Sequence, residues 1–130
     1  MHVKNLVPVL SVVDVEKTLR FYQEALQFEV VERCEHDRLV QWASVRSGEA
    51  ELVFARCEVA QSVLPFSTKE NLVLYFYPDD VEALHAALKG SDYPVSELRV
   101  SLSGMKECAL TDPDGYQLWF GQETRESPAV

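Results

Sequence analysis

The chain repeats part of its own pattern after 66 residues, and this repeat limits the possible folds more than any other feature. Leu52-Val53-Phe54 recurs as Leu118-Trp119-Phe120, and Asp14-Val15-Glu16 recurs as Asp80-Val81-Glu82. Two separate landmarks that share one offset indicate an internal duplication. At 130 residues the chain has the length of a single domain, so we predict one domain built from two similar modules. The expected segments are module one at 5–57, a linker at 58–70, module two at 71–121 and a disordered tail at 123–130.

Both modules show the same order of elements. Asp14 is a suitable N-cap for the first helix and Asp79 or Asp80 for the second, and apolar residues recur at helical spacing after them. Late in module two, Asp112-Pro113-Asp114-Gly115 predicts a tight turn, because Pro113 fixes φ near −65° and Gly115 can adopt positive φ. A strand pattern follows this turn. Each module therefore predicts a βαβββ order, which gives an α+β fold of eight strands and two helices.

Expected element bounds follow from the same patterns. Pro8 places the first strand at an edge, or at another position where the missing N–H is harmless. The first helix lacks a glycine at its end, so Gln27 or Phe28 must supply the final turn, whereas Gly90 suits the position just past the second helix. Strands are expected at 5–13, 28–33, 39–46, 51–57, 72–77, 95–100, 105–110 and 117–121, and helices at 15–27 and 81–89.

The charge and cysteine content narrow the classes of function. A net charge of −9 argues against a nucleic-acid partner, because phosphate binding needs a basic face. No apolar run approaches the roughly 20 residues of a membrane helix, and the N-terminus lacks the apolar core of a signal peptide. Three cysteines without C-x-x-C spacing predict buried free thiols in a reducing cytoplasm. We expect a cytoplasmic protein with neither a nucleic-acid nor a membrane partner.

Three stretches resemble the vicinal oxygen chelate superfamily, the group of glyoxalases, bleomycin resistance proteins and extradiol dioxygenases. They are Val9–Tyr22, Gly104–Cys108 and Asp112–Gln122, which spread over both modules. The resemblance implies paired βαβββ modules, each a curved mixed sheet with its helix on the convex side. It also implies a concave ligand cavity and usually a homodimer, either with modules paired within the chain or swapped across the dimer.

Metal-dependent members of that family carry a His, Glu or Gln ligand on the first and last strand of each module. The resemblance places these positions at Val7, Val53, Val73 and Trp119, and none of these side chains can coordinate a divalent cation. A slip of one residue gives four leucines. The three histidines lie on unrelated elements. A slip of two residues gives Asn5, Asn71, Glu51 and Gln117, a set with one carboxylate and no histidine. We therefore predict no metal site and no cofactor.

Strand alternation predicts which side chains face the cavity. Leu118 and Phe120 should pack beneath a helix, and so the residues between and beside them should face the concave side. By the offset of 66, Trp42 corresponds to Cys108 on the helix-packed face, although a register slip would move it into the cavity. The predicted ligand-binding residues are Trp119, Tyr75, Glu107, Glu51, Gln117 and Trp42.

Each of these residues also has an interpretation without a ligand. Trp119 could fill the space that a metal and its ligands would occupy, and Tyr75 could belong to a dimer interface. Glu107 could be a structural acid paired with Arg99. Trp42 could simply be a core residue.

Three functions fit these observations. The first is a metal-free binding protein, similar to bleomycin resistance proteins, that sequesters an aromatic or cationic organic ligand in an apolar dimer cavity. The second is a glyoxalase-like lyase, isomerase or dioxygenase with a divergent metal site, in which Glu51 or Glu107 acts as the base. The third is a structural or regulatory module whose cavity is filled. We favour the binding protein, with no catalytic residue.

Overall fold

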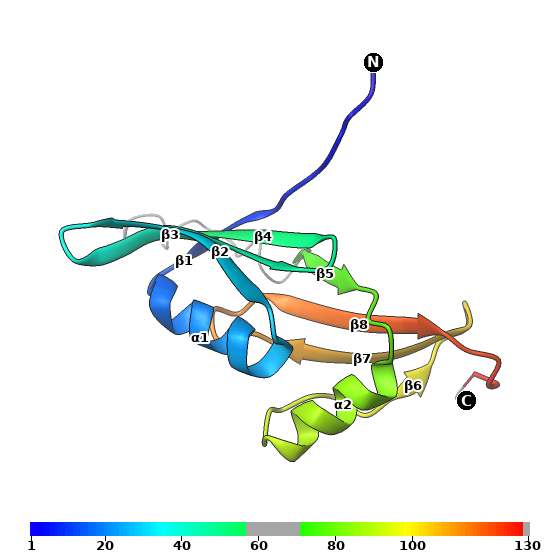
Figure 1. Ribbon diagram of the computed structural model, residues 1–130. Helices are drawn as coiled ribbons and strands as arrows, with labels where there is room; N and C mark the ends of the chain where they lie inside the picture. The colour runs from blue at the N-terminus through cyan, green and yellow to red at the C-terminus, as the bar shows by residue number, and fades with distance from the viewer. Residues whose placement is uncertain (57–70, 129–130) are drawn as a thin grey trace. The chain divides into compact units, whose positions relative to one another are not determined.

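A computed structural model describes residues 1–56 and 71–128 (Figure 1). The described residues fall into two compact units, one on each side of the gap. Each unit holds one helix and one four-stranded sheet. The linker expected at 58–70 lies outside the described residues. Neither of the two helices in the described ranges has the length and apolarity required to cross a membrane.

The first unit contains β1 (Val9–Val12), α1 (Val15–Leu26), β2 (Glu29–His36), β3 (Leu39–Ser47) and β4 (Ala50–Arg56). Its strands are ordered β1-β4-β3-β2. β1 runs parallel to β4, whereas the other two pairings are antiparallel. The chain therefore passes from β1 through α1 and returns by a meander to pair beside its own start.

The second unit contains β5 (Val73–Phe76), α2 (Val81–Gly90), β6 (Arg99–Val100), β7 (Met105–Thr111) and β8 (Gln117–Glu123). Its strand order is β5-β8-β7-β6, with β5 parallel to β8. This is the topology of the first unit. The predicted α+β fold with two tandem βαβββ modules is confirmed.

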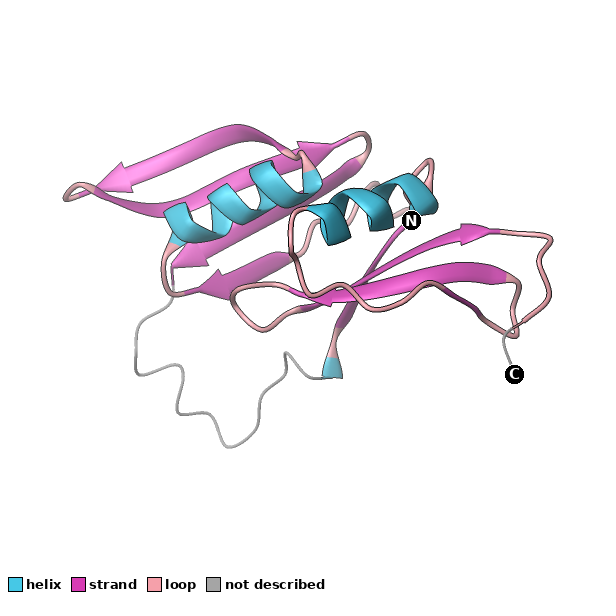
Figure 2. Ribbon diagram, turned by 90° about the horizontal axis from the view of Figure 1, so that it is seen from below, coloured by secondary structure: helices cyan, strands magenta, loops and turns pink. Residues whose placement is uncertain are grey.

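Each helix covers one face of its own sheet, as Figure 2 shows. In the first unit, α1 buries Tyr22 against Phe54 of β4, with ring centroids 4.8 Å apart. In the second unit, Leu88 of α2 is buried together with Leu118 and Phe120 of β8. Alternation along the strands therefore gives each sheet a helix-covered face and an opposite face that we call its open face.

The helix ends follow the sequence prediction at their N-termini. Asp14 accepts a hydrogen bond from the backbone N–H of Lys17 at 3.2 Å, and Asp80 accepts one from Ala83 at 3.0 Å. These are N-cap bonds. At the end of α1, Gln27 has a φ of 58° and supplies the left-handed turn without a glycine, as expected.

Several bounds differ from the prediction. Gly90 is the last residue of α2, and Asp92 takes the positive φ of 62° instead. β1 begins at Val9 rather than at residue 5. β6 has two residues rather than six because the segment before it meets β7 irregularly: the Ser96 hydroxyl, not a backbone carbonyl, accepts the Ala109 N–H.

The ends of two strands also differ from the expected bounds. β2 runs on to His36 because Asp37 and Arg38 both adopt positive φ and close a two-residue hairpin. β8 continues to Glu123, where the tail was expected to begin, and the backbone N–H of Thr124 donates to the carbonyl of Gly104.

Candidate functional site

The open face of the second sheet brings together most of the predicted ligand-binding residues. Leu118 and Phe120 are buried on the helix-covered side, so the alternate residues of β8 lie on the open face. The strand register then sets their neighbours, because Trp119 pairs with both Tyr75 of β5 and Ala109 of β7. We call this surface the aromatic face and define it by Val73, Tyr75, Tyr77, Glu107, Gln117, Trp119 and Gly121.

Three aromatic rings, two at the end of β5 and one from within β8, form a continuous cluster on this face. The Tyr75 ring lies 4.9 Å from that of Tyr77 and 6.4 Å from that of Trp119, the latter at an edge-on angle of 63°. Trp119 remains 41% exposed and Tyr77 77% exposed. Large aromatic side chains in contact with solvent offer ring faces on which a flat molecule can stack.

An acid is held at the edge of this cluster. The Tyr75 hydroxyl donates a hydrogen bond of 2.5 Å to Glu107, which lies two strands away. Burial of the phenol, followed by this hydrogen bond, raises the pKa of Tyr75 well above its ordinary value. Tyr75 is therefore neutral at physiological pH and acts as the donor in this bond.

Gly121 separates the two partners of this hydrogen bond. It pairs with Glu107 in the β7–β8 register, and the Tyr75 phenol passes over it. A Cβ atom at position 121 would lie 1.8 Å from the Tyr75 hydroxyl oxygen, a distance that no side chain tolerates. From the sequence we expected Gly121 at the end of a strand and did not predict its role, because the close approach depends on the pairing of three strands.

The other two predicted site residues belong to the first unit. Glu51 lies on the open face of the first sheet, where its carboxylate pairs with Arg46 at 3.2 Å. Trp42 pairs with Ala55 in the β3–β4 register and is 36% exposed. It therefore lies on the open face, and its assignment to the helix-packed face was wrong.

The reason is a difference in turn length between the modules. Four residues lie between the paired residues Arg46 and Glu51 of the first unit, whereas five lie between their counterparts Thr111 and Gln117 in the second. In the β3–β4 register Ala43 pairs with Phe54, and in the β7–β8 register Cys108 pairs with Phe120. Corresponding residues of the two modules are therefore 66 apart on the last strand but 65 apart on the strand before it. A change of one residue reverses the face, and Trp42 corresponds to Glu107 rather than to Cys108.

The four family metal positions do not suit a divalent cation. Val7, Val53, Val73 and Trp119 offer no ligand atom. Across residues 1–56 and 71–128, no three side chains of His, Cys, Asp and Glu come together as a possible metal site. His85 is partly buried, and its Nε2 lies 3.0 Å from the Ser96 carbonyl oxygen.

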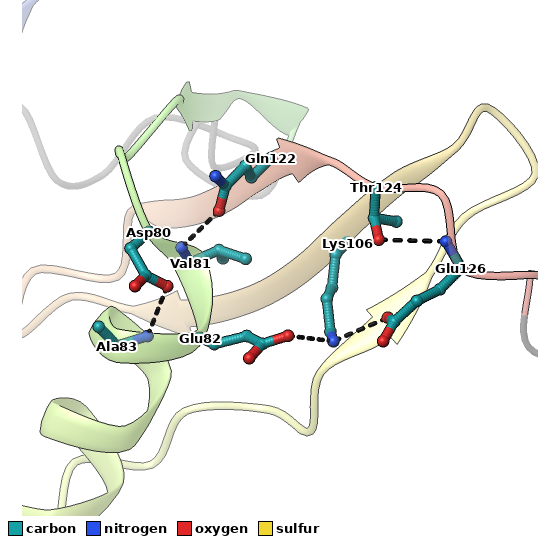
Figure 3. Close-up of polar contacts among 8 residues, drawn as sticks. All are labelled: Asp80, Val81, Glu82, Ala83, Lys106, Gln122, Thr124 and Glu126. Atoms are coloured by element: carbon teal, nitrogen blue, oxygen red, sulfur yellow. Dashed lines mark hydrogen bonds and ion pairs between the residues drawn. The ribbon is translucent and has the colours of Figure 1, made fainter.

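A polar hollow of about 340 Å³ lies where α2 begins (Figure 3). Gln122 accepts from the backbone N–H of Val81 and donates to the carbonyl of Asp79, which fixes the start of the helix to β8. Lys106 bridges Glu82 of α2 at 2.5 Å and Glu126 at 2.7 Å. Each residue drawn there takes part in at least one hydrogen bond or ion pair, so this hollow is a structural junction. No sequence pattern pointed to it.

Comparisons with known proteins agree with this architecture. The model of the Glyoxalase/Bleomycin resistance protein/Dioxygenase superfamily matches residues 2–120. Among curated proteins, no sequence matches the chain.

Solved structures match the chain over nearly its whole length. The bleomycin resistance determinant encoded on the transposon Tn5 is 22% identical with a TM-score of 0.70, covering 93% of this chain and 98% of its own. TnmS3, an antibiotic binding protein from Streptomyces sp. CB03234, is 22% identical with a TM-score of 0.68 over 95% and 100%. Lactoylglutathione lyase from Agrobacterium tumefaciens is 17% identical with a TM-score of 0.68 over 93% and 95%. At these identities the likeness establishes the fold.

Proposed function

We propose, since the chain belongs to the Glyoxalase/Bleomycin resistance protein/Dioxygenase superfamily, that it is a metal-independent binding protein for a small organic molecule. The ligand is aromatic or cationic, and the protein sequesters it rather than converting it. The bleomycin resistance determinant and the antibiotic binding protein TnmS3 share this fold, which supports a binding role without naming the ligand.

The observation that carries the proposal is the aromatic face. Its exposed Trp119 and Tyr77 rings lie beside a carboxylate, Glu107, on the side of the sheet that the helix leaves open. Stacking of a flat ligand on one ring, or a cation over it, contributes about 0.5–2 kcal/mol. An apolar surface with a few fixed polar groups is the usual composition of a small-molecule site.

The chemistry of the family's metal positions supports a role without metal. A metal ion in this superfamily would act as a Lewis acid that polarises substrate oxygens. Valine at three of the four positions and tryptophan at the fourth cannot hold such an ion. The proposal therefore assigns the work of recognition to the aromatic rings and the acid.

Two further parts of the proposal concern assembly and location. We propose that two copies form a homodimer whose cavity receives the ligand, and light scattering coupled to gel filtration tests this directly. A monomer at micromolar concentration that still binds ligand would refute the dimer. We also place the protein in the cytoplasm, since Cys34 and Cys108 carry free thiols.

Binding can be tested by calorimetry and tryptophan fluorescence with a panel of aromatic compounds, cationic and neutral, bleomycin included. Saturable binding without divalent metal is expected. Trp119→Ala should weaken it about 5- to 30-fold, the equivalent of 1–2 kcal/mol of ring contact, and Trp119→Phe should restore part of the loss. Leu102→Ala, which alters an exposed side chain on the β6–β7 connection, is the matched control.

The alternative is an enzyme of the same fold. The A. tumefaciens lyase has a similar structure, and Glu107 on the aromatic face, or Glu51 beside Arg46, could act as a base. Turnover of a hemithioacetal substrate upon addition of nickel, zinc, manganese or ferrous iron would favour the enzyme. Binding that appears only with metal would likewise overturn the metal-independent proposal.

A further inference from the structure

Tyr75, Gly121 and Glu107 form one arrangement across three neighbouring strands. The tyrosine belongs to β5, the glycine to β8 and the glutamate to β7. The phenol crosses the central strand over Gly121 and reaches the carboxylate at 2.5 Å. Because Gly121 has no side chain, the ring can lie against the backbone. Any larger residue at 121 would remove the path between the two partners.

The fold itself does not require a glycine at this place. The first unit has the same topology, and the residues that correspond to Tyr75, Gly121 and Glu107 are Val9, Ala55 and Trp42. Ala55 pairs with Trp42 as Gly121 pairs with Glu107, so an alanine fits the strand when no tyrosine crosses it. The missing side chain at 121 therefore serves the tyrosine and not the sheet.

The hydrogen bond also restrains the acid. An ionised carboxylate can accept about four hydrogen bonds, and the phenol uses one of them. Arg99 pairs with Glu107 across β6 and β7, but within the described ranges Glu107 forms no ion pair with it or with any lysine. Glu107 thus keeps acceptor capacity beside the aromatic rings. A side chain already held in one position loses little conformational entropy when a ligand binds.

We propose that Tyr75 and Gly121 are positioning residues that hold Glu107 as a preformed acceptor for a protonated nitrogen of the ligand, while the ligand's aromatic body stacks on Trp119. This inference rests on the proposed function and names the ligand class within it: an aromatic amine or a similar cation. Tyr75 acts through Glu107, and Gly121 acts through Tyr75. Neither needs to touch the charged group itself.

The experiment measures a preference rather than an affinity alone. Aromatic amines are compared with their neutral alcohol counterparts, starting with 2-naphthylmethylamine and 2-naphthylmethanol, by calorimetry or NMR titration at pH 7. Wild-type protein should prefer the amine by about 10- to 100-fold, as expected for hydrogen bonds to a charged group. Glu107→Gln should abolish the preference and leave binding of the alcohol unchanged within about twofold. Tyr93→Phe, a tyrosine change elsewhere in the same unit, is the matched control for the Tyr75→Phe variant described next and should leave the preference intact.

The positioning role is tested by two further variants. Tyr75→Phe should reduce the amine preference several-fold without weakening the alcohol. Gly121→Ala alone is expected to destabilise the protein, because its Cβ collides with the phenol. In a Tyr75→Ala background that collision is gone, so adding Gly121→Ala should change neither the melting temperature nor the preference.

Several results would overturn the inference. Equal binding of amine and alcohol by wild type would refute it while leaving the proposed function intact. An unchanged preference in folded Tyr75→Phe would show that the phenol positions nothing. A large loss of stability from Gly121→Ala in the Tyr75→Ala background would show that the glycine serves the sheet. Failure of wild type to bind either member of any pair in the panel would refute the proposed function and this inference with it.

Discussion

Asp112 holds the turn before the last strand, and replacing it tests the structural argument most directly. The residue is 4% exposed. Its Oδ1 atom accepts hydrogen bonds from the backbone N–H groups of Asp114 and Tyr116, both at 2.9 Å. Its own N–H donates to the Tyr116 carbonyl, and its carbonyl accepts from Gly115. One side chain thus fixes the turn that delivers Trp119 to the aromatic face.

The size of the loss follows from these bonds. A hydrogen bond to a charged group contributes about 1.5–3 kcal/mol, and a buried donor without a partner costs about 1–3 kcal/mol. In Asp112→Ala the Tyr116 N–H loses its acceptor in a buried position, whereas the Asp114 N–H is partly accessible to water. We expect the free energy of unfolding to fall by about 2–4 kcal/mol. For a chain of this size the melting temperature should fall by about 6–16 °C.

The matched variant is Asp112→Asn. Both bonds end on one oxygen, and an asparagine side chain retains such an oxygen. Urea unfolding should therefore show a smaller loss for asparagine than for alanine. A loss below about 0.5 kcal/mol for Asp112→Ala would refute the reasoning. Equal losses for both variants would show that these two bonds do not stabilise the turn.

Two more predictions concern the second unit. Lys106→Met removes the ion pairs with Glu82 and Glu126. The melting temperature should therefore fall in low salt, and the difference from wild type should shrink in 1 M salt. A difference that does not depend on salt would contradict an origin in the ion pairs. Burial raises the pKa of the Cys108 thiol to about 11, so at pH 8 its thiolate population is about 100-fold below that of an ordinary thiol. Mass spectrometry after brief alkylation should find partly exposed Cys34 modified well before Cys108, and the reverse order would refute the assignment.

The fold could be predicted from the sequence because its constraints are local and repeated. Asp14 and Asp80 cap their helices, and the helix caps and the last strands of the two modules recur at one offset of 66, so the element order follows from neighbouring residues. The face of Trp42 could not be predicted in this way. It depends on the number of residues in the turn that follows its strand, between β3 and β4, and the two modules differ at that turn.

The central contact of the candidate site could not be predicted from the sequence for a different reason. Alternation placed Tyr75, Glu107 and Trp119 on one face, and the structure agrees. It could not show that Tyr75 reaches Glu107, because that contact crosses an intervening strand and needs a missing side chain at Gly121. The alternation of side chains along a strand assigns each residue to one face of the sheet. Contacts across three strands depend in addition on the registers of two strand pairs at once.

The last strands of the two modules keep the same two residues where they face a helix and differ where they do not. Leu52 and Phe54 are buried in the first unit, and Leu118 and Phe120 are buried at the same places in the second. Packing beneath a helix constrains volume and shape, so similar residues suit both. The open faces carry no such constraint from the helices.

On those faces the modules carry different chemistry. The first sheet pairs Arg46 with Glu51, which satisfies both charges. The second holds Glu107 through the neutral donor Tyr75 and leaves the carboxylate able to accept more. A pair that neutralises itself has little to offer a charged ligand, whereas an acid held without a cation has its charge available. Within a duplicated fold, this difference points to the second open face as the place where recognition of a cationic ligand should be sought first.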